Sequence, residues 1–155
     1  MVENKTKEET KGKNLPPRKI EYLIIHFSAS TFGNVREINN WHKQRNFPIS
    51  PISNLYCGYH YVILPSGKVE QGRLDREAGC HCRGYNEKSI GICFIGNDKP
   101  NTQQWNSLLF LCRIKKKEYS IKTENILGHC ETKKYVQRTK KKCPGFDVAE
   151  LREAV

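Results

Sequence analysis

Hydrophobic positions along the chain follow two different periods, which together predict a sheet covered by helices. Short runs rich in β-branched and aromatic residues, bounded by Gly, Pro, Asn or Ser, are typical of strands. Longer segments repeat apolar residues at helical spacing, as Val35, Ile38 and Trp41 do in the first of them. The expected strands cover residues 20–26, 59–64, 68–71, 89–95 and 125–128, and helices are expected from 34 to about 46, from 102 to 119 and after 147.

Residues that cap helices stand where the expected helices begin. Asn34 precedes the first helix, and Glu37 follows it three residues later. Thr102 is expected to cap the second helix. Asp147 is expected to cap the last one, with Glu150 completing a capping box. These signals support helices at all three positions.

The order of the expected elements predicts the fold class. The order is strand, helix, hairpin, strand, helix, strand, helix, which indicates an α/β protein with a central mixed β-sheet of about five strands flanked by about three helices. The chain has 155 residues, which is enough for a single domain and too few for two ordinary ones. The Lys- and Glu-rich start lacks aromatic residues, so we expect residues 1–18 to be a disordered basic and polar tail and residues 19–155 to form the domain.

The charge of the chain is strongly basic. The formal net charge is +11, and residues 113–142 hold eleven Lys or Arg against three Glu. Such a surface attracts polyanions, of which nucleic acid and the anionic polymers of a bacterial envelope are two candidates, or it simply keeps the protein soluble. The chain has neither an apolar signal region nor the roughly 20 apolar residues of a membrane span, so we expect cytoplasmic synthesis without a signal peptide or membrane span.

Three residues form a candidate metal site. His26 and His129 each stand at the end of an expected strand, and Cys143 opens a Cys-Pro-Gly turn. Strand ends on one edge of a sheet lie close together, so the fold can bring these residues to one place. Two imidazoles and a thiolate favour zinc, and three protein ligands leave a fourth position for water, which zinc makes nucleophilic near neutral pH. If the three converge, the protein is expected to be a hydrolase that uses Zn²⁺.

The other cysteines allow a second metal site. Cys80-His81-Cys82 packs three ligand types into three residues, with Cys57 upstream. Neighbouring side chains diverge in extended structure, so a ligand-free loop is the simpler interpretation. The seven cysteines are an odd number, which argues against a paired disulfide framework, and cytosolic synthesis favours free thiols for the six outside the candidate site.

The motifs together resemble the type 2 N-acetylmuramoyl-L-alanine amidases, and most of all the short amidase-type lysozymes of bacteriophages. The matching segments occur in family order and cover about residues 20–150. They are Ile25-His26-Phe27-Ser28-Ala29-Ser30, Val35-Arg36-Glu37-Ile38 with Trp41-His42-Lys43, Gly58-Tyr59-His60-Tyr61-Val62-Ile63, Gly84-Tyr85-Asn86 with Ser89-Ile90-Gly91-Ile92-Cys93, Gly128-His129, and Lys141-Lys142-Cys143-Pro144-Gly145-Phe146-Asp147.

The resemblance implies a reaction and a set of roles. The family hydrolyses the amide bond between N-acetylmuramic acid and L-alanine in peptidoglycan. Its zinc ligands fall on His26, His129 and Cys143, so residues 19–155 would be a zinc amidase domain. Its catalytic tyrosine and lysine fall on Tyr59 and Lys141, which can donate to the oxyanion or relay a proton.

Further site residues are also implied, with one departure from the family. His81 lies in a Gly-rich loop that borders the substrate groove in the family, and His81 and Trp41 are expected to contact substrate. Some family members carry a glutamate as general base in the third core strand, where this chain has Cys93. A glutamate mechanism is therefore not expected, which gives Tyr59 a larger part in proton transfer.

The expected partner is peptidoglycan, with anionic cell-wall polymers as a second binding target, and no specific nucleic-acid recognition is expected. The protein is expected to be a monomer that acts on the cell wall after release, as an endolysin does, or a cytosolic recycling amidase. One alternative is a peptidoglycan-binding module without catalysis, although such proteins commonly lack the cysteine ligand. Another is a regulator that binds a protein or nucleic acid through the basic surface.

Overall fold

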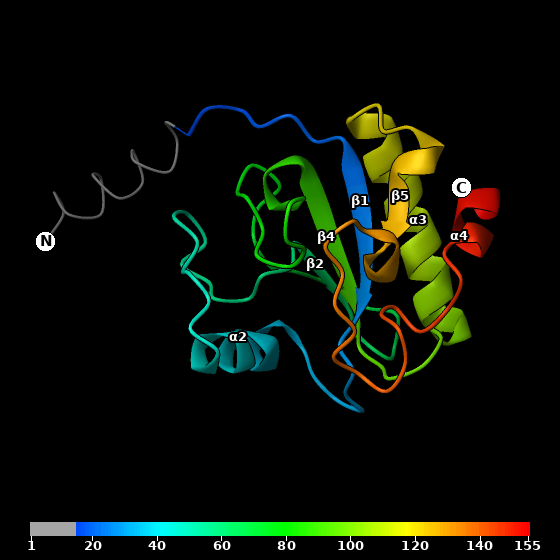
Figure 1. Ribbon diagram of the computed structural model, residues 1–155, viewed down its shortest axis with the longest axis horizontal. Helices are drawn as coiled ribbons and strands as arrows, with labels where there is room; N and C mark the ends of the chain where they lie inside the picture. The colour runs from blue at the N-terminus through cyan, green and yellow to red at the C-terminus, as the bar shows by residue number, and fades with distance from the viewer. Residues whose placement is uncertain (1–14) are drawn as a thin grey trace, which may run out of the picture.

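A five-stranded sheet with helices on both faces forms the centre of the computed structural model, which describes residues 15–155 (Figure 1). Residues 1–14 of the expected tail lie outside the described part. The strands are β1 (Tyr22–Phe27), β2 (Tyr61–Ile63), β3 (Val69–Gln71), β4 (Ser89–Phe94) and β5 (Ile126–Gly128). The helices are α2 (Val35–Gln44), α3 (Thr102–Glu118) and α4 (Ala149–Ala154), with short 3₁₀ turns η1 (Asn86–Lys88), η2 (Thr123–Asn125) and η3 (His129–Glu131).

The sheet is mixed, with the strand order β3-β2-β4-β1-β5. β1 lies parallel to both β4 and β5, β2 lies parallel to β4, and only β3 is antiparallel to its neighbour. This confirms the α/β fold class with five strands and three helices. Because β4, β1 and β5 are parallel, their carboxyl ends reach the same edge of the sheet.

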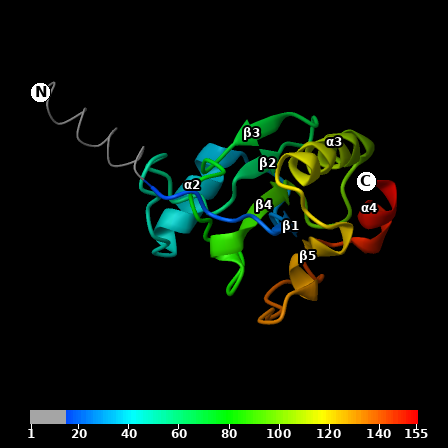
Figure 2. The ribbon, with the colours of Figure 1, turned by 90° about the horizontal axis from the view of Figure 1, so that it is seen from above.

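Alternation along β1 gives the sheet two different faces. Leu23, Ile25 and Phe27 enter a core that includes side chains of α3 and α4. Ile24 instead packs with residues of the loop before β4, and His26 stands two positions after it, on the same face. Figure 2 shows α3 and α4 on one side of the sheet and α2 on the other. The face covered by α3 and α4 holds the main core, and His26 lies on the opposite face.

The helix caps agree only partly with expectation. The Asn34 side chain accepts a hydrogen bond from the Glu37 N–H at 2.9 Å, as predicted. The predicted cap at Thr102 is wrong, because Asn101 takes that place: its side chain accepts from the Gln104 N–H at 2.8 Å, and the Gln104 side chain accepts from the Asn101 N–H at 3.1 Å. Thr102 is instead the first helical residue. None of the described helices has the length and apolar character needed to cross a membrane.

The start of α4 differs from the predicted capping box. The helix begins at Ala149, so Val148 occupies the cap position and offers no side-chain acceptor. Asp147 still contributes, because its carboxylate accepts from the Ala149 N–H at 3.0 Å. The box between Asp147 and Glu150 is wrong, since the cap falls one residue later than expected.

Arg18 ties the start of the described chain to the sheet. Its guanidinium donates to the carbonyls of Asp75 at 2.7 Å, Asn86 at 3.1 Å and Ser89 at 2.9 Å, and it lies 3.1 Å from the Nε2 atom of His60. Four contacts of this kind fix a long side chain that would otherwise be free. The folded part therefore includes Arg18, which falls within the segment expected to be a tail.

A buried carboxylate holds together the loop before β2 and the loop after β3. Glu77 is 0% exposed and accepts from the backbone N–H groups of Ile52 at 2.6 Å, Ser53 at 2.7 Å and Leu74 at 2.9 Å, and from the Ser53 hydroxyl. Burial alone raises the pKa of Glu77, but the hydrogen bonds outweigh it, so the pKa lies below its usual value. The ionised carboxylate is thus part of the fold.

We expect Glu77→Gln to lower the free energy of unfolding by about 1–3 kcal/mol at neutral pH, because buried donors would lose their acceptor. A carboxylate with a lowered folded pKa stabilises the protein above its unfolded pKa of about 4.3, and this contribution is lost as the pH falls through the folded pKa. Urea unfolding at pH 7 and at acid pH would test this. The difference in the free energy of unfolding between the unaltered protein and Glu77→Gln should become smaller in acid. The control Glu124→Gln, at an exposed position, should show no such difference. A difference independent of pH would contradict the prediction.

Candidate metal centre

Three side chains meet at the carboxyl edge of β1 and β5. His26 lies near the end of β1, His129 follows β5 directly, and Cys143 comes from the loop that runs beside the end of β1 (Figure 1). One ligand atom from each lies within 4.8 Å of the others. The Cys143 Sγ atom is 3.9 Å from the His26 Nδ1 atom, and the His26 and His129 rings are 4.7 Å apart. The structure therefore brings together the three residues that the sequence singled out.

The candidate ligand atoms lie within 4.8 Å of one another and would close by up to about 1.5 Å around a tetrahedral zinc ion. Zinc binds nitrogen and sulfur at about 2.0–2.3 Å, so its ligand atoms stand roughly 3.3–3.6 Å apart. The observed 3.9 Å between Cys143 Sγ and His26 Nδ1 requires only a small closing movement. Two imidazoles and one thiolate suit zinc, and a set of three protein ligands leaves one position open to water or substrate.

The surroundings of the three candidate ligands shift their pKa values. Burial lowers the pKa of His26 well below its usual value, and the neighbouring imidazoles lower it further. Burial also lowers the pKa of His129. Both rings are therefore neutral, which is the form that binds a metal. Burial raises the pKa of the Cys143 thiol to about 12, so metal binding there releases a proton.

Two side chains that the sequence analysis missed support the ligands. The Tyr135 hydroxyl accepts from the Cys143 N–H at 3.3 Å, and its ring packs edge-on against His129 at 5.0 Å. The Thr132 hydroxyl donates to the His129 carbonyl at 2.7 Å. Both residues lie in the basic loop after β5. The only sequence signal for them is Thr132, a residue type that often stabilises a turn through its hydroxyl.

A cavity of about 470 Å³ opens beside the three ligands. Tyr59 lines it, with its ring 5.0 Å from the His26 ring. Burial raises the pKa of Tyr59 well above its usual value, and the thiols of Cys93, Cys143 and Cys57 add to the rise. The Tyr59 hydroxyl therefore keeps its proton and can donate a hydrogen bond to a group in the cavity.

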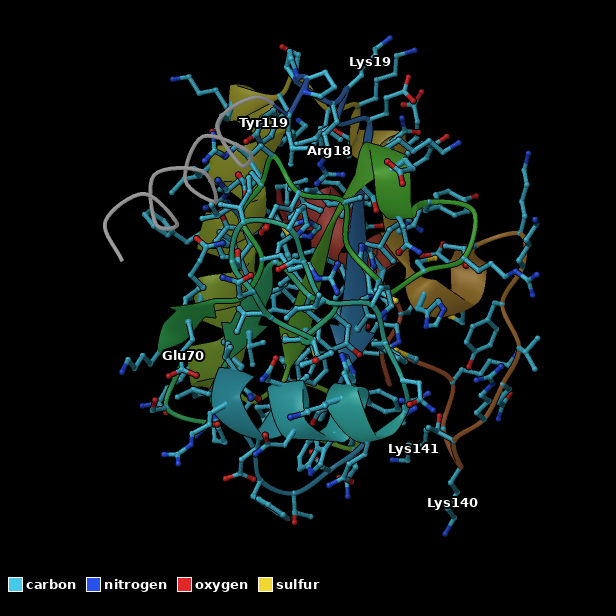
Figure 3. The ribbon with its side chains drawn as sticks, turned by 90° about the vertical axis from the view of Figure 1, so that its left-hand side faces the viewer. Arg18, Lys19, Glu70, Tyr119, Lys140 and Lys141 are labelled. Carbon is cyan, nitrogen blue, oxygen red and sulfur yellow. The ribbon has the colours of Figure 1, made fainter. Side chains whose placement is uncertain are left out.

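Lys141 and Trp41, which the sequence also predicted as site residues, lie outside this cavity. The Lys141 ammonium group pairs with Asp98 at 2.8 Å, and both side chains are at least half exposed. Figure 3 shows Lys141 on the C-terminal loop, at the opposite end of the molecule from Arg18. Trp41 packs edge-on against Phe32 at 5.7 Å, within the cluster between α2 and the sheet. Neither side chain lines the cavity.

His81 does line the cavity, but the nearest polar partner of its ring is the candidate ligand His26. Its Nδ1 atom lies 2.9 Å from the Nε2 atom of His26. The rival metal site at Cys80-His81-Cys82 is not assembled, because among residues 15–155 only His26, His129 and Cys143 converge closely enough to hold an ion. All seven cysteines are free thiols.

The cavity has basic walls and no carboxylate. Arg45, Arg83, Lys134 and Arg138 are among its lining residues, which include neither Asp nor Glu. Cys93 pairs with His26 in the sheet register and is 0% exposed. Burial raises the pKa of the Cys93 thiol well above its usual value, so it is neutral and no substitute for a catalytic carboxylate.

Comparisons with known sequences agree with this geometry. The profile of the family described as N-acetylmuramoyl-L-alanine amidase matches residues 16–146. The endolysin of Enterobacteria phage T3 is 32% identical over 146 residues, which cover 86% of this chain and 85% of that protein. The endolysin of Escherichia phage T7 is 32% identical over 139 residues, which cover 81% of each.

Comparisons with solved structures give the same fold. The N-acetylmuramoyl-L-alanine amidase LysC from Clostridium intestinale aligns with a TM-score of 0.72 and 24% identity, over 90% of this chain and 89% of that one. Drosophila PGRP-LB aligns with a TM-score of 0.62 and 26% identity, over 83% of this chain and 75% of that one. The chain belongs to the N-acetylmuramoyl-L-alanine amidase family, and within it is similar to phage endolysins.

Proposed function

We propose that the protein is a zinc-dependent N-acetylmuramoyl-L-alanine amidase. It would hydrolyse the amide bond between N-acetylmuramic acid and L-alanine in peptidoglycan, as an endolysin-like cell-wall enzyme. The observation that carries this proposal is the convergence of His26, His129 and Cys143, whose ligand atoms lie within 4.8 Å of one another beside a cavity. Membership of the amidase family and the similarity to two phage endolysins support it.

The proposed reaction assigns a role to each side chain at the metal site. A zinc ion held by His26, His129 and Cys143 would polarise the scissile carbonyl and lower the pKa of a water molecule. Tyr59 keeps its hydroxyl proton and lines the cavity, so it can donate a hydrogen bond to the oxyanion as the carbonyl carbon becomes tetrahedral. Since the lining residues include no carboxylate, Tyr59 is also our candidate for relaying to the leaving amine the proton that the attacking water gives up, so that its own hydroxyl is restored.

Lys141 can take part in the proposed reaction only if its side chain moves toward the cavity. Its ammonium group would have to leave Asp98, and that pair is exposed to solvent on both sides. Exposed ion pairs are weak, so an anionic oxyanion or substrate carboxylate could compete for the lysine. We therefore keep Lys141 as a proposed second donor that acts after substrate binding, and we omit Trp41 because its ring is packed against Phe32.

The cations on the cavity walls suit an acidic peptide. Arg45, Arg83, Lys134 and Arg138 line the cavity, and none of them has an ion-pair partner within the described residues. The stem peptide of peptidoglycan carries free carboxylates next to the bond to be cut. We propose that these cations bind the stem peptide and hold the amide over the metal site.

Arg83→Gln combined with Arg138→Gln is expected to lower kcat/KM on muropeptides at least about tenfold at low salt, since even one charge-assisted hydrogen bond contributes roughly 1.5–3 kcal/mol. The matched control is Lys116→Gln with Lys117→Gln, which removes the same charge from a surface outside the cavity. Assays on soluble muropeptides would separate the two pairs. An equal loss in both would mean that overall charge, and not the cavity wall, attracts the substrate.

Digestion of purified sacculi, with and without a zinc chelator, tests the proposal as a whole. Mass spectrometry should find stem peptides with a new L-alanine amino terminus and intact glycan, and none after chelation. Binding of muropeptides without release of new amino termini would favour the alternative of a non-catalytic recognition module. Cleavage at a glycosidic bond, or cleavage that continues without zinc, would refute the proposal.

We also propose where the protein acts and what else it binds. It would be made in the cytoplasm as a monomer and would reach the wall after release. A second, open hollow of about 660 Å³ is lined by Arg113, Lys116, Lys117 and Lys122, which suits anionic wall polymers. Nucleic acid would bind there only nonspecifically, so that binding should vanish at near-physiological salt.

A further inference from the structure

His81 is held between a metal ligand and a strand residue. Its Nδ1 atom lies 2.9 Å from the His26 Nε2 atom, and its Nε2 atom lies 3.2 Å from the Ser89 hydroxyl. The His81 and His26 rings meet edge to face, with centroids 5.0 Å apart and an 88° angle between their planes. Both nitrogens of His81 are therefore occupied, and one of them faces a residue that we propose as a zinc ligand.

The hydrogen bond between His26 Nε2 and His81 Nδ1 contains one proton, which can be carried by either nitrogen. If the proton is on His26 Nε2, the His26 Nδ1 atom keeps its lone pair on the side where Cys143 Sγ lies 3.9 Å away. His81 then carries its own proton on Nε2 and donates it to Ser89. If the proton is instead on His81 Nδ1, His26 presents an Nδ1–H group toward Cys143 and cannot bind a metal there. Only the first arrangement leaves His26 ready for zinc.

The chain makes room for the His81 ring in this position. A Cβ atom on Gly79 would lie 2.4 Å from the ring, and one on Gly91 would lie 2.6 Å from it. The main chain at His81 is fixed as well, because the backbone N–H groups of His81 and Cys82 donate to the Asn86 side chain at 2.8 and 2.9 Å. Two glycines and one asparagine thus determine where the ring lies.

We propose that His81 is a positioning residue for the metal site, and this inference rests on the proposed zinc function. It accepts the Nε2–H of His26 and so keeps the His26 Nδ1 lone pair directed at the ion. Partners of this kind orient metal-binding imidazoles and raise their basicity. This role differs from the substrate contact that the sequence suggested, and it does not require His81 to touch substrate.

The test compares two replacements of His81 in the full-length protein. Asn places a carbonyl oxygen close to the former Nδ1 position and keeps an acceptor, whereas Leu fills the space without one. His81→Leu is expected to weaken zinc binding about 10- to 100-fold, and His81→Asn much less. The measurement is competition for zinc between the protein and a chromophoric chelator. His60→Leu is the control, because His60 is also buried and packs edge-on against the His81 ring at 5.9 Å, but its hydrogen bonds are with Arg18, Gly91 and Glu77 and none joins it to His26.

A second measurement does not depend on any variant. Long-range ¹H–¹⁵N NMR of the zinc-free, unaltered protein should find the His26 proton on Nε2. A proton on Nδ1, or zinc binding by a folded His81→Leu protein as tight as that of the unaltered one, would overturn the inference. If the unaltered protein itself binds no zinc, or if Cys143→Ala binds it equally well, the proposed function fails instead. The two failures can therefore be told apart.

Discussion

Replacing Cys143 with alanine is expected to lower amidase activity at least about a thousandfold, because the metal contributes several kcal/mol of transition-state stabilisation. The purified variant should also lose its zinc, since only His26 and His129 would remain near the ion. Elemental analysis of the protein and release of L-alanine amino termini from sacculi would measure both effects.

The control for Cys143→Ala is Cys112→Ala. Cys112 is a residue of α3 that is 0% exposed and packs into the main core. Its replacement therefore removes a buried thiol that does not line the cavity. This variant should lose some stability but keep its zinc and its activity. A Cys143→Ala protein that retains full activity at normal zinc content would mean that the proposed metal site is not the catalytic one.

Replacing Tyr59 with phenylalanine is the second large expected effect. The ring and its packing against His26 at 5.0 Å would remain, and only the hydroxyl would be lost. Removal of one oxyanion donor lowers kcat by about 100- to 1000-fold, so the loss should appear in kcat and leave zinc content and KM nearly unchanged. Steady-state kinetics on a soluble muropeptide, with zinc determined on the same samples, would measure it.

Tyr61→Phe provides a matched comparison for Tyr59→Phe. The Tyr61 hydroxyl donates to Asp75 at 2.6 Å and is not part of the cavity lining. Its loss should lower stability and leave kcat unaltered. If Tyr59→Phe retained normal kcat while Lys141→Met lost it, the oxyanion donor would be the lysine, released from Asp98 when substrate binds.

The local pattern of the sequence was enough to predict the fold and to place two of the candidate metal ligands, His26 and His129, at strand ends. Apolar runs ending in His26 and before His129 predicted buried strands, and parallel strands bring their ends to one edge. The register confirms this, because Ile25 pairs with Gly128 and His26 follows directly in β1. The loop that carries Cys143 lacks such a pattern, so the strand pattern alone did not predict that Cys143 would lie beside the other two.

Features that depend on contacts between distant segments could not be predicted in this way. The ion pair of Lys141 with Asp98 and the packing of Trp41 on Phe32 both place a predicted site residue away from the cavity. The contact of His81 with His26 spans 55 positions, and nothing in the local sequence indicates it. The predicted N-cap at Thr102 was wrong by one residue, because the neighbouring Asn101 is the better hydrogen-bond acceptor and takes the cap position.

The long separation in sequence between the proposed zinc ligands has a consequence for synthesis of the protein. His26 and Cys143 are 117 positions apart, and Cys143 is the last of the three to be translated. A ribosome that stalls before that codon leaves a fragment without the third proposed ligand, however well the earlier strands fold. Wall-cutting activity would then appear only in chains made past residue 143, and fragments from interrupted translation would leave the wall of the producing cell intact.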